Sequence, residues 1–258
     1  MPDDVRERIL AYGSAGVGKS FAILNLAQIV SVTSPESTVW IIDADDGLAK
    51  LRKAKFPFLT NIKWEHILAW PQIQEAIPFL KANVKRHDWI CIDMIGRFWE
   101  MAQSFEVGEV YGKTASEFML VARAEAIAAA KLNKPATLPS VDWNIVKKLH
   151  NDDFIDKLAS DFPCNLFVTT SADPLIADMD DPKTIAMFAS VGFKPDGEKR
   201  NPHRFDTVMF LRSMRDGTRV FSTIKDRARP LIKETPFESL IGDYNAALLN
   251  AKADPIFK

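Results

Sequence analysis

One eight-residue run near the start of the chain has the composition and spacing of a phosphate-binding loop. Residues 13–20 read GSAGVGKS and fit the pattern G-x-x-x-x-G-K-[ST]. Glycines carry no Cβ, so backbone N–H groups can turn toward phosphate oxygens. The Lys19 ammonium would reach the β- and γ-phosphates, and the Ser20 hydroxyl would coordinate Mg²⁺. The run therefore predicts an ATP and Mg²⁺ site made by Gly13, Ser14, Ala15, Gly16, Val17, Gly18, Lys19 and Ser20.

The segments on either side of this loop have the character that such a site requires. Residues 8–12, RILAY, resemble a short apolar strand, and residues 21–30, FAILNLAQIV, resemble an apolar helix. A strand, a glycine loop and a helix in this order place the phosphates at a helix N-terminus. We therefore interpret the run as a nucleotide site rather than as a glycine-rich turn with a chance lysine.

Hydrolysis of a triphosphate also needs an acid that organises the metal and a group that positions water. Asp93 closes the apolar strand 89–92 and is predicted to hold the Mg²⁺ shell beside Ser20; the alternative is a strand-end acid that caps a loop. Asp45 lies in the acidic run 43–46 after an earlier strand and is predicted to polarise the attacking water. The alternative is that these acids only solubilise a turn at Asp46–Gly47.

Alternating apolar strands and helical patterns must position these residues, and they predict an α/β fold. We expect a mostly parallel central sheet flanked by helices, with a C-terminal β-hairpin around Asp216–Gly217. The expected strands are residues 38–43, 65–69, 88–93, 165–170, 206–211 and 218–224, and the expected helices are residues 48–54, 71–86, 114–131, 141–160 and 236–252. Residues 96–113 are expected to be a loop with short helical pieces.

The bulk composition limits the class of protein. With 258 residues, 47% of them hydrophobic, the chain suits one core over residues 1–235, with a helical elaboration at about 96–161 and a helical tail over 236–258. The formal net charge of -1 excludes nucleic-acid binding by overall charge, so any such surface must be local.

Cysteines and apolar runs predict the compartment. Cys91 and Cys164 lie in strand-like segments and are expected to be buried, reduced thiols without zinc-site spacing. The acidic start of the chain lacks an apolar signal core, and no apolar run approaches the ~20 residues that span a bilayer. We expect a soluble cytoplasmic protein without a membrane partner, in the host cytoplasm if it is viral.

Two segments resemble RecA-like recombinases. Residues 41–48, IIDADDGL, resemble the RecA segment I-D-A-E-H-A-L, in which the Glu activates water; Asp45 stands at that Glu, one methylene shorter. Residues 165–171 resemble the next core strand, which ends in RecA in a glutamine that senses the γ-phosphate; Thr170 or Ser171 stands there in this chain. The resemblance implies a RecA-like P-loop ATPase, with turnover that is slow or differently organised.

The segment Ile224-Lys225-Asp226-Arg227 resembles the basic-x-basic motif of RecA-like filaments. In that family the two cations reach the γ-phosphate bound by the neighbouring subunit. The resemblance implies that Lys225 and Arg227 act in trans, where they would neutralise charge that develops during phosphoryl transfer. It also implies self-assembly into a filament or ring whose ATP sites are shared between subunits. The alternative is two solvated charges after a hairpin strand.

A narrower resemblance is to phage-associated AAA-family ATPases with a RecA core, including RecA-core single-strand annealing proteins. It covers residues 6–235 in motif order and includes Asp142–Trp143 and the basic hairpin ending in K-x-R. It implies an ATPase that acts on single-stranded DNA in recombination or annealing. In RecA-like proteins the loops that correspond to residues 96–113 and 171–204 face the filament axis and hold single-stranded DNA.

Residues 194–229 are locally basic, with ten Lys and Arg against five Asp and Glu. Cations and aromatic rings together could neutralise phosphates and stack bases. The candidate nucleic-acid residues are Lys194, Lys199, Arg200 and Arg204, with Phe188 and Phe193 as stacking side chains. The alternative is a solvated loop whose phenylalanines pack on the core, and the acidic stretch 173–181 favours it.

Other functions share the phosphate-binding loop and Asp93. They are an ATP-dependent DNA-packaging or assembly factor, a small-molecule kinase and a non-hydrolysing nucleotide switch. A packaging factor would usually carry a further domain, and a kinase would carry an arginine-rich lid. Asp45 in place of Glu favours the switch. The sequence leaves open the adenine contacts, the choice of filament or ring, and the pathway.

Overall fold

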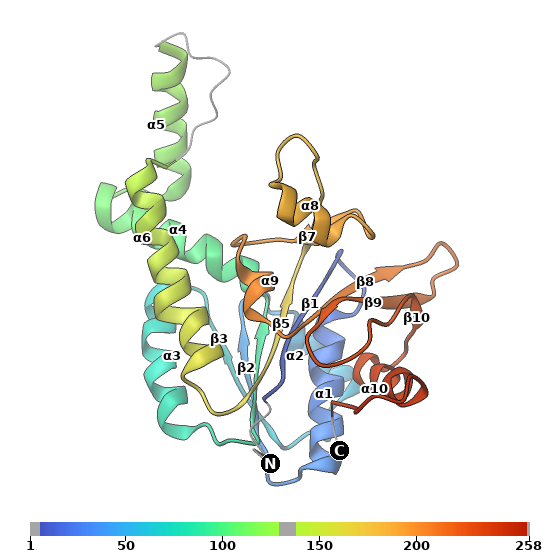
Figure 1. Ribbon diagram of the computed structural model, residues 1–258. Helices are drawn as coiled ribbons and strands as arrows, with labels where there is room; N and C mark the ends of the chain where they lie inside the picture. The colour runs from blue at the N-terminus through green and yellow to red at the C-terminus, as the bar shows by residue number, and fades with distance from the viewer. Residues whose placement is uncertain (1–5, 129–137, 257–258) are drawn as a thin grey trace.

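A computed structural model describes residues 6–128 and 138–256 of the protein. Within these residues eight strands form one sheet in the spatial order β10-β9-β8-β1-β5-β4-β2-β3 (Figure 1), and two short strands pair separately. The strands are β1 (Arg8–Gly13), β2 (Val39–Asp43), β3 (Ile62–His66), β4 (Trp89–Asp93), β5 (Asn165–Thr170), β6 (Ala172–Pro174), β7 (Phe193–Pro195), β8 (Thr207–Ser213), β9 (Arg219–Asp226) and β10 (Thr235–Pro236).

The strands from β8 to β3 run parallel, whereas β9 is antiparallel to β8 and β10 is antiparallel to β9. Every residue of β2 and β4 is buried, as expected for parallel strands covered on both faces. The predicted α/β fold, a mostly parallel sheet flanked by helices with a C-terminal hairpin, is confirmed. All carboxyl ends of the parallel strands therefore meet at one edge, which we call the carboxyl edge; the opposite side is the amino edge.

Helices cover both faces of the sheet. The described helices are α1 (Lys19–Thr33), α2 (Gly47–Lys55), α3 (Trp70–Asn83), α4 (Ile95–Tyr111), α5 (Ala115–Ala128), α6 (Ser140–His150), the π-helical turn η1 (Asn151–Ile155), α7 (Asp156–Ser160), α8 (Pro182–Phe188), α9 (Asn201–Arg204) and α10 (Leu240–Asn250). Helices α1 and α10 build one apolar cluster with residues such as Leu26 and Tyr244. Helices α3, α4 and α6 build the other with residues such as Phe98 and Val146.

Residues 96–113, expected to be a loop, form most of helix α4, so that prediction is wrong. The reason is a helical apolar face: Phe98, Ala102 and Val107 are buried against the core. Gly108 is tolerated inside the helix, and Gly112, with φ of 61°, ends it. Arg97, Glu100, Ser104 and Glu109 lie on the solvated face of the helix, whereas Glu106 is buried together with the apolar residues.

Several other boundaries differ from expectation. The third strand is Ile62–His66 rather than 65–69, and the helix expected over 141–160 contains the π-helical turn η1. Residues 171–204 are not one loop, because β6, α8, β7 and α9 lie within them. The helix expected over 114–131 is α5 to Ala128, and the rest of that range lies outside the described residues.

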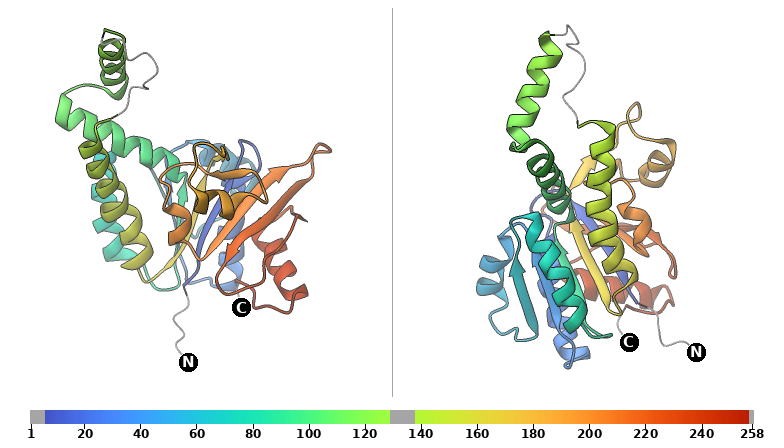
Figure 2. Two further views of the ribbon diagram at one scale, coloured as in Figure 1. Left: turned by 45° about the horizontal axis from the view of Figure 1, so that its top comes forward. Right: turned by 90° about the vertical axis from the view of Figure 1, so that its left-hand side faces the viewer.

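Two peripheral helices are attached in different ways. Helix α5 buries none of its residues and projects away from the sheet beyond the carboxyl edge (Figure 2). Helix α10, within the expected tail 236–258, instead packs on α1 and buries Leu240, Ile241, Tyr244 and Leu248. None of the described helices is long and apolar enough to cross a bilayer.

Candidate nucleotide site

The phosphate-binding loop connects β1 to α1 at the carboxyl edge, as its sequence context predicts. Two of its glycines are required by geometry. A Cβ on Gly13 would lie 2.4 Å from the Leu211 carbonyl oxygen of the neighbouring strand β8. Gly18 has φ of 103°, a left-handed conformation that side chains disfavour, and it caps α1. Helix α1 therefore begins at Lys19 with its free backbone N–H groups directed at the loop.

Lys19 lies inside this loop. Its side chain is buried, and Nζ donates hydrogen bonds to the carbonyl oxygens of Gly13 at 2.8 Å and Ser14 at 2.9 Å. Burial lowers the pKa of the ammonium, while the charges of Asp93 and Asp45 act in the opposite direction. The ammonium is thus held at the loop by two neutral carbonyl acceptors. Negatively charged phosphate oxygens can replace them, because hydrogen bonds between two charged groups are stronger.

Ser20 and Asp93 meet beside Lys19. The Ser20 hydroxyl donates to Oδ2 of Asp93 at 2.6 Å, and the Thr169 hydroxyl donates to Oδ1 of the same carboxylate. These residues come from α1, the end of β4 and β5, so three elements converge on one carboxylate. Burial raises the pKa of Asp93, and the hydrogen bonds from the two hydroxyls oppose that shift.

The donor set at Ser20 and Asp93 fits Mg²⁺. Both side chains offer hard oxygen atoms, and Mg²⁺ in nucleotide sites takes one or two carboxylates together with phosphate oxygens and water. In residues 6–128 and 138–256 no group of three His, Cys, Asp or Glu side chains forms a metal site made by protein ligands alone. Ser20 and Asp93 would therefore hold the ion jointly with the phosphates.

Two acidic residues, one at the end of β2 and one just after it, have different environments. Asp45, predicted to activate water, is exposed, and its charge acts on Lys19, Asp43 and Asp93. Asp43 is fully buried; its Oδ1 accepts the Asp45 backbone N–H at 2.9 Å, and its Oδ2 has no hydrogen-bond partner among the residues that the structure describes. Asp43 is the register partner of Asp93 on the adjacent strand β4.

The sequence therefore predicts Asp45, and not Asp43, as the acid that acts on water. The sequence feature that points to Asp43 is that two apolar strands, 39–43 and 89–93, both end in Asp. Only the pairing of these strands in one register brings the two carboxylates together. Burial raises the pKa of Asp43, and the charges of Asp93 and Asp45 raise it further. The raised pKa increases the proton affinity of the Asp43 carboxylate, whose Oδ2 has no partner among the described residues.

Lys225 and Arg227 lie at the amino edge, away from the loop of their own chain. Both positions can be compared along strand β8. Asp226 of β9 pairs with Thr207 at the start of β8, whereas Gly13 pairs with Leu211 near its end. Four residues of β8 separate these two positions, which corresponds to a distance of roughly 13 Å along the strand. The structure thus brings Lys19, Ser20, Asp45 and Asp93 together and leaves Lys225 and Arg227 apart from them.

Both distant cations are engaged within the chain. Lys225 Nζ donates to the carbonyl oxygens of Pro202, at 3.0 Å, and Phe205, and burial lowers its pKa. Arg227 donates to the Asp206 carboxylate at 3.0 Å and to the His203 carbonyl oxygen at 3.1 Å.

The candidate nucleic-acid residues divide into two pairs. Lys194 forms an ion pair with Asp180, and Arg204 forms ion pairs with Asp156 and Glu198. Lys199 and Arg200 are exposed. The two aromatic candidates also differ, because Phe188 is buried in the core whereas Phe193 is partly exposed and stacks on Phe210.

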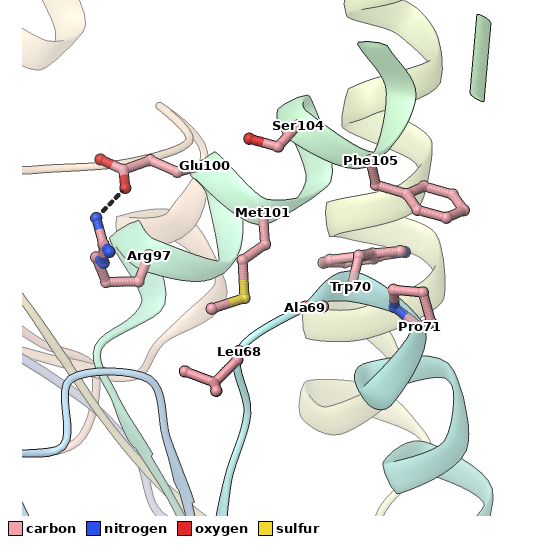
Figure 3. A pocket seen from close by; sticks show the side chains of 9 residues that line it. All are labelled: Leu68, Ala69, Trp70, Pro71, Arg97, Glu100, Met101, Ser104 and Phe105. Atoms are coloured by element: carbon pink, nitrogen blue, oxygen red, sulfur yellow. Dashed lines mark hydrogen bonds and ion pairs between the residues drawn. The ribbon is translucent and has the colours of Figure 1, made fainter. Parts of the chain in front are cut away.

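A separate hollow of about 420 Å³ opens between the start of α3 and helix α4. Figure 3 shows Leu68 and Met101 facing one another there, with the Arg97–Glu100 ion pair at one side. The phosphate-binding loop contributes none of its lining residues. The hollow and the nucleotide site are therefore distinct features of the molecule.

Comparison with models of protein families finds a similarity in the first part of the chain. Residues 6–116 match the family model of an AAA domain. The matched range contains the phosphate-binding loop, both strand-end carboxylates Asp43 and Asp93, and helix α4. This likeness is to a nucleotide-binding P-loop ATPase domain and covers the first part of the chain. A search of curated proteins found no match to the chain.

Proposed function

We propose that the protein binds Mg²⁺-ATP and hydrolyses it. The observation that supports this most strongly is the convergence of Lys19, Ser20 and Asp93 at one edge of the sheet, with the Ser20 hydroxyl 2.6 Å from the Asp93 carboxylate. A chance glycine turn would not place a metal-type carboxylate from another strand at the first turn of the following helix. The AAA-domain likeness over residues 6–116 supports the same proposal.

Each residue has a distinct role in this reaction. The loop N–H groups hold the phosphates, and Lys19 compensates the charge on the β- and γ-phosphates. Ser20 and Asp93 hold Mg²⁺, which supplies charge neutralisation during phosphoryl transfer. Asp43, with its unpartnered oxygen, accepts the proton of the attacking water, and Asp45 adds negative charge beside it.

The test is nucleotide titration and phosphate release with wild type and Lys19→Ala. Loss of the charge-assisted contacts should weaken ATP binding by at least tenfold and abolish turnover. Lys81→Ala removes an equal charge from an exposed position on α3 and serves as the control. Equal ATP affinity in wild type and Lys19→Ala, with both proteins folded by circular dichroism, would sink the proposal.

We further propose that the ATPase assembles with itself and acts on single-stranded DNA in recombination or annealing, as in a phage. The exposed side chains of Lys199 and Arg200 support a DNA contact, and the Lys225–Arg227 motif supports a site completed by a neighbouring subunit. The double variant Lys199→Ala/Arg200→Ala should weaken binding of labelled single-stranded DNA and lower its salt dependence.

The exposed pair Lys147 and Lys148 on α6 provides a control of equal charge, as Lys147→Ala/Lys148→Ala. Equal loss in both double variants would contradict a specific DNA contact. ATP-dependent assembly, followed by light scattering, tests the oligomer separately. Phosphate release by wild type separates this proposal from a non-hydrolysing switch.

A further inference from the structure

The phosphate-binding loop has a second basic neighbour in its own chain. Strand β9 begins at Arg219, which pairs with Ser213 at the carboxyl-edge end of the β8–β9 hairpin (Figure 1). A Cβ built on Gly18 would lie 3.4 Å from Nη1 of Arg219 and 3.9 Å from its Cδ and Cζ. The guanidinium therefore lies against the loop residue that immediately precedes Lys19.

Arg219 has no competing partner among the described residues. Its side chain is exposed and makes no hydrogen bond or ion pair there, while its carbonyl oxygen accepts the Phe237 N–H at 3.0 Å and fixes the backbone. Of the other charged groups near the hairpin turn, Arg212 pairs with Glu234 and Asp216 accepts the Thr218 N–H at 2.9 Å, while Arg215 lies exposed in the turn itself. A guanidinium held beside the loop without a carboxylate partner is available to an incoming anion.

Resting on the proposed function, we propose that Arg219 binds the phosphate chain of the nucleotide held by its own subunit's loop. The planar guanidinium can donate two parallel hydrogen bonds to phosphate oxygens, which an ammonium cannot do. Loop N–H groups cradle the α- and β-phosphates, whereas Lys19 reaches the β- and γ-phosphates. Arg219, which lies over Gly18, contacts the α- and β-phosphates, so it serves ADP as well as ATP.

This role differs from that of a finger supplied by a neighbouring subunit. A trans contact on the γ-phosphate would act on ATP alone and only in the assembled protein. The Arg219 contact is present in the monomer and does not distinguish the two nucleotides. Arg219 is thus a positioning residue for the phosphates that also adds positive charge to the site before any assembly occurs.

The experiment measures Kd for ADP and ATP by calorimetry with wild type, Arg219→Ala, Arg219→Lys and Arg215→Ala. Loss of a charge-assisted contact should weaken both nucleotides about tenfold to a hundredfold in Arg219→Ala. Arg219→Lys should recover only part of that loss, because the lysine ammonium restores the positive charge but cannot donate two parallel hydrogen bonds. Arg215→Ala removes an equal charge from an exposed position on the same hairpin and should leave both affinities unchanged.

Each outcome decides the inference. A loss shared by Arg219→Ala and Arg215→Ala, or a loss for ATP with none for ADP, overturns it. Wild-type affinity in Arg219→Ala also overturns it while the proposed function stands, because the wild type still binds nucleotide. If the wild type binds neither nucleotide, the proposed function fails and this inference fails with it.

Discussion

The two ends of β9 are both basic, yet their surroundings differ. At the carboxyl edge, Arg219 lies against Gly18 of the phosphate-binding loop with no partner among the described residues. At the amino edge, Lys225 and Arg227 are held by carbonyl oxygens and by Asp206 of their own chain. A positive charge alone therefore does not identify a residue that binds phosphate. Its distance from the phosphate-binding loop and the absence of competing partners do.

The amino edge contains a buried ion-pair network as well. Arg229 pairs with Glu7, with side-chain exposures of 9% and 11%, and the Tyr244 hydroxyl donates to Asp226 at 2.5 Å. Buried charges of this kind must be paired, because an unpaired charge in the interior is strongly unfavourable. This end of β9 therefore stabilises the fold, whereas the other end is free to bind. The predictions below test that division.

The largest expected effect is on stability, from Arg229→Met at the amino edge. Removal of the guanidinium leaves Glu7 buried without its partner, which should lower the free energy of unfolding by about 3–5 kcal/mol. Nucleotide affinity should not change, because the site lies at the other edge. Chemical denaturation and nucleotide titration measure the two quantities.

Arg212→Met provides the matched control for this change. Arg212 pairs with Glu234 on the surface, with side-chain exposures of 42% and 60%, and such pairs contribute less than about 1 kcal/mol. Equal destabilisation by the two variants would contradict the structural role assigned to the amino edge.

The second prediction concerns Asp43→Asn at the carboxyl edge. Phosphate release should fall by about a hundredfold or more if Asp43 accepts the proton of the attacking water. ATP affinity should be retained, because Lys19, Ser20 and Asp93 are untouched. Asp45→Asn is the comparison, and a larger loss of turnover in that variant would assign the role to Asp45 instead.

The same variant should change how stability depends on pH. Burial raises the pKa of Asp43, so the folded state binds more protons than the unfolded state between the ordinary carboxyl pKa and the raised value. The free energy of unfolding therefore falls as pH rises through that window. Asn does not titrate, so Asp43→Asn should remove this fall and be more stable than wild type at neutral pH. Denaturation series across acidic and neutral pH measure the difference.

The smallest expected effect on stability is that of Arg227→Ala. Its side chain is 54% exposed, and its ion pair with Asp206 should contribute less than about 1 kcal/mol. This variant is therefore suited to test the proposed contact with a neighbouring subunit. ATP-stimulated assembly and turnover should be lost if Arg227 acts in trans; unchanged turnover in the assembled protein would mean that its role is only local.

Much of the fold could be predicted, because the relevant patterns are local. The apolar strands at β2, β4 and β5, and the hairpin around Asp216–Gly217, are visible in short windows of sequence. The largest exception was α4, whose buried face is spaced over four turns and is interrupted by Gly108. A helical pattern with glycines in it has the composition of a loop, and only the surface against which its apolar face packs distinguishes the two.

The sequence by itself determined the phosphate-binding loop, because every feature that defines it lies within eight consecutive residues and their flanks. Tertiary structure alone decided which distant residues join it. Asp43 meets Asp93 because β2 and β4 are neighbours in register, and Arg219 reaches Gly18 because β8 lies beside β1. Strand order and register bring together residues that are 50 to 201 positions apart. The residues next to each position in the sequence do not determine which distant residues are its neighbours in space. The sequence therefore locates the site but does not identify all the residues around it.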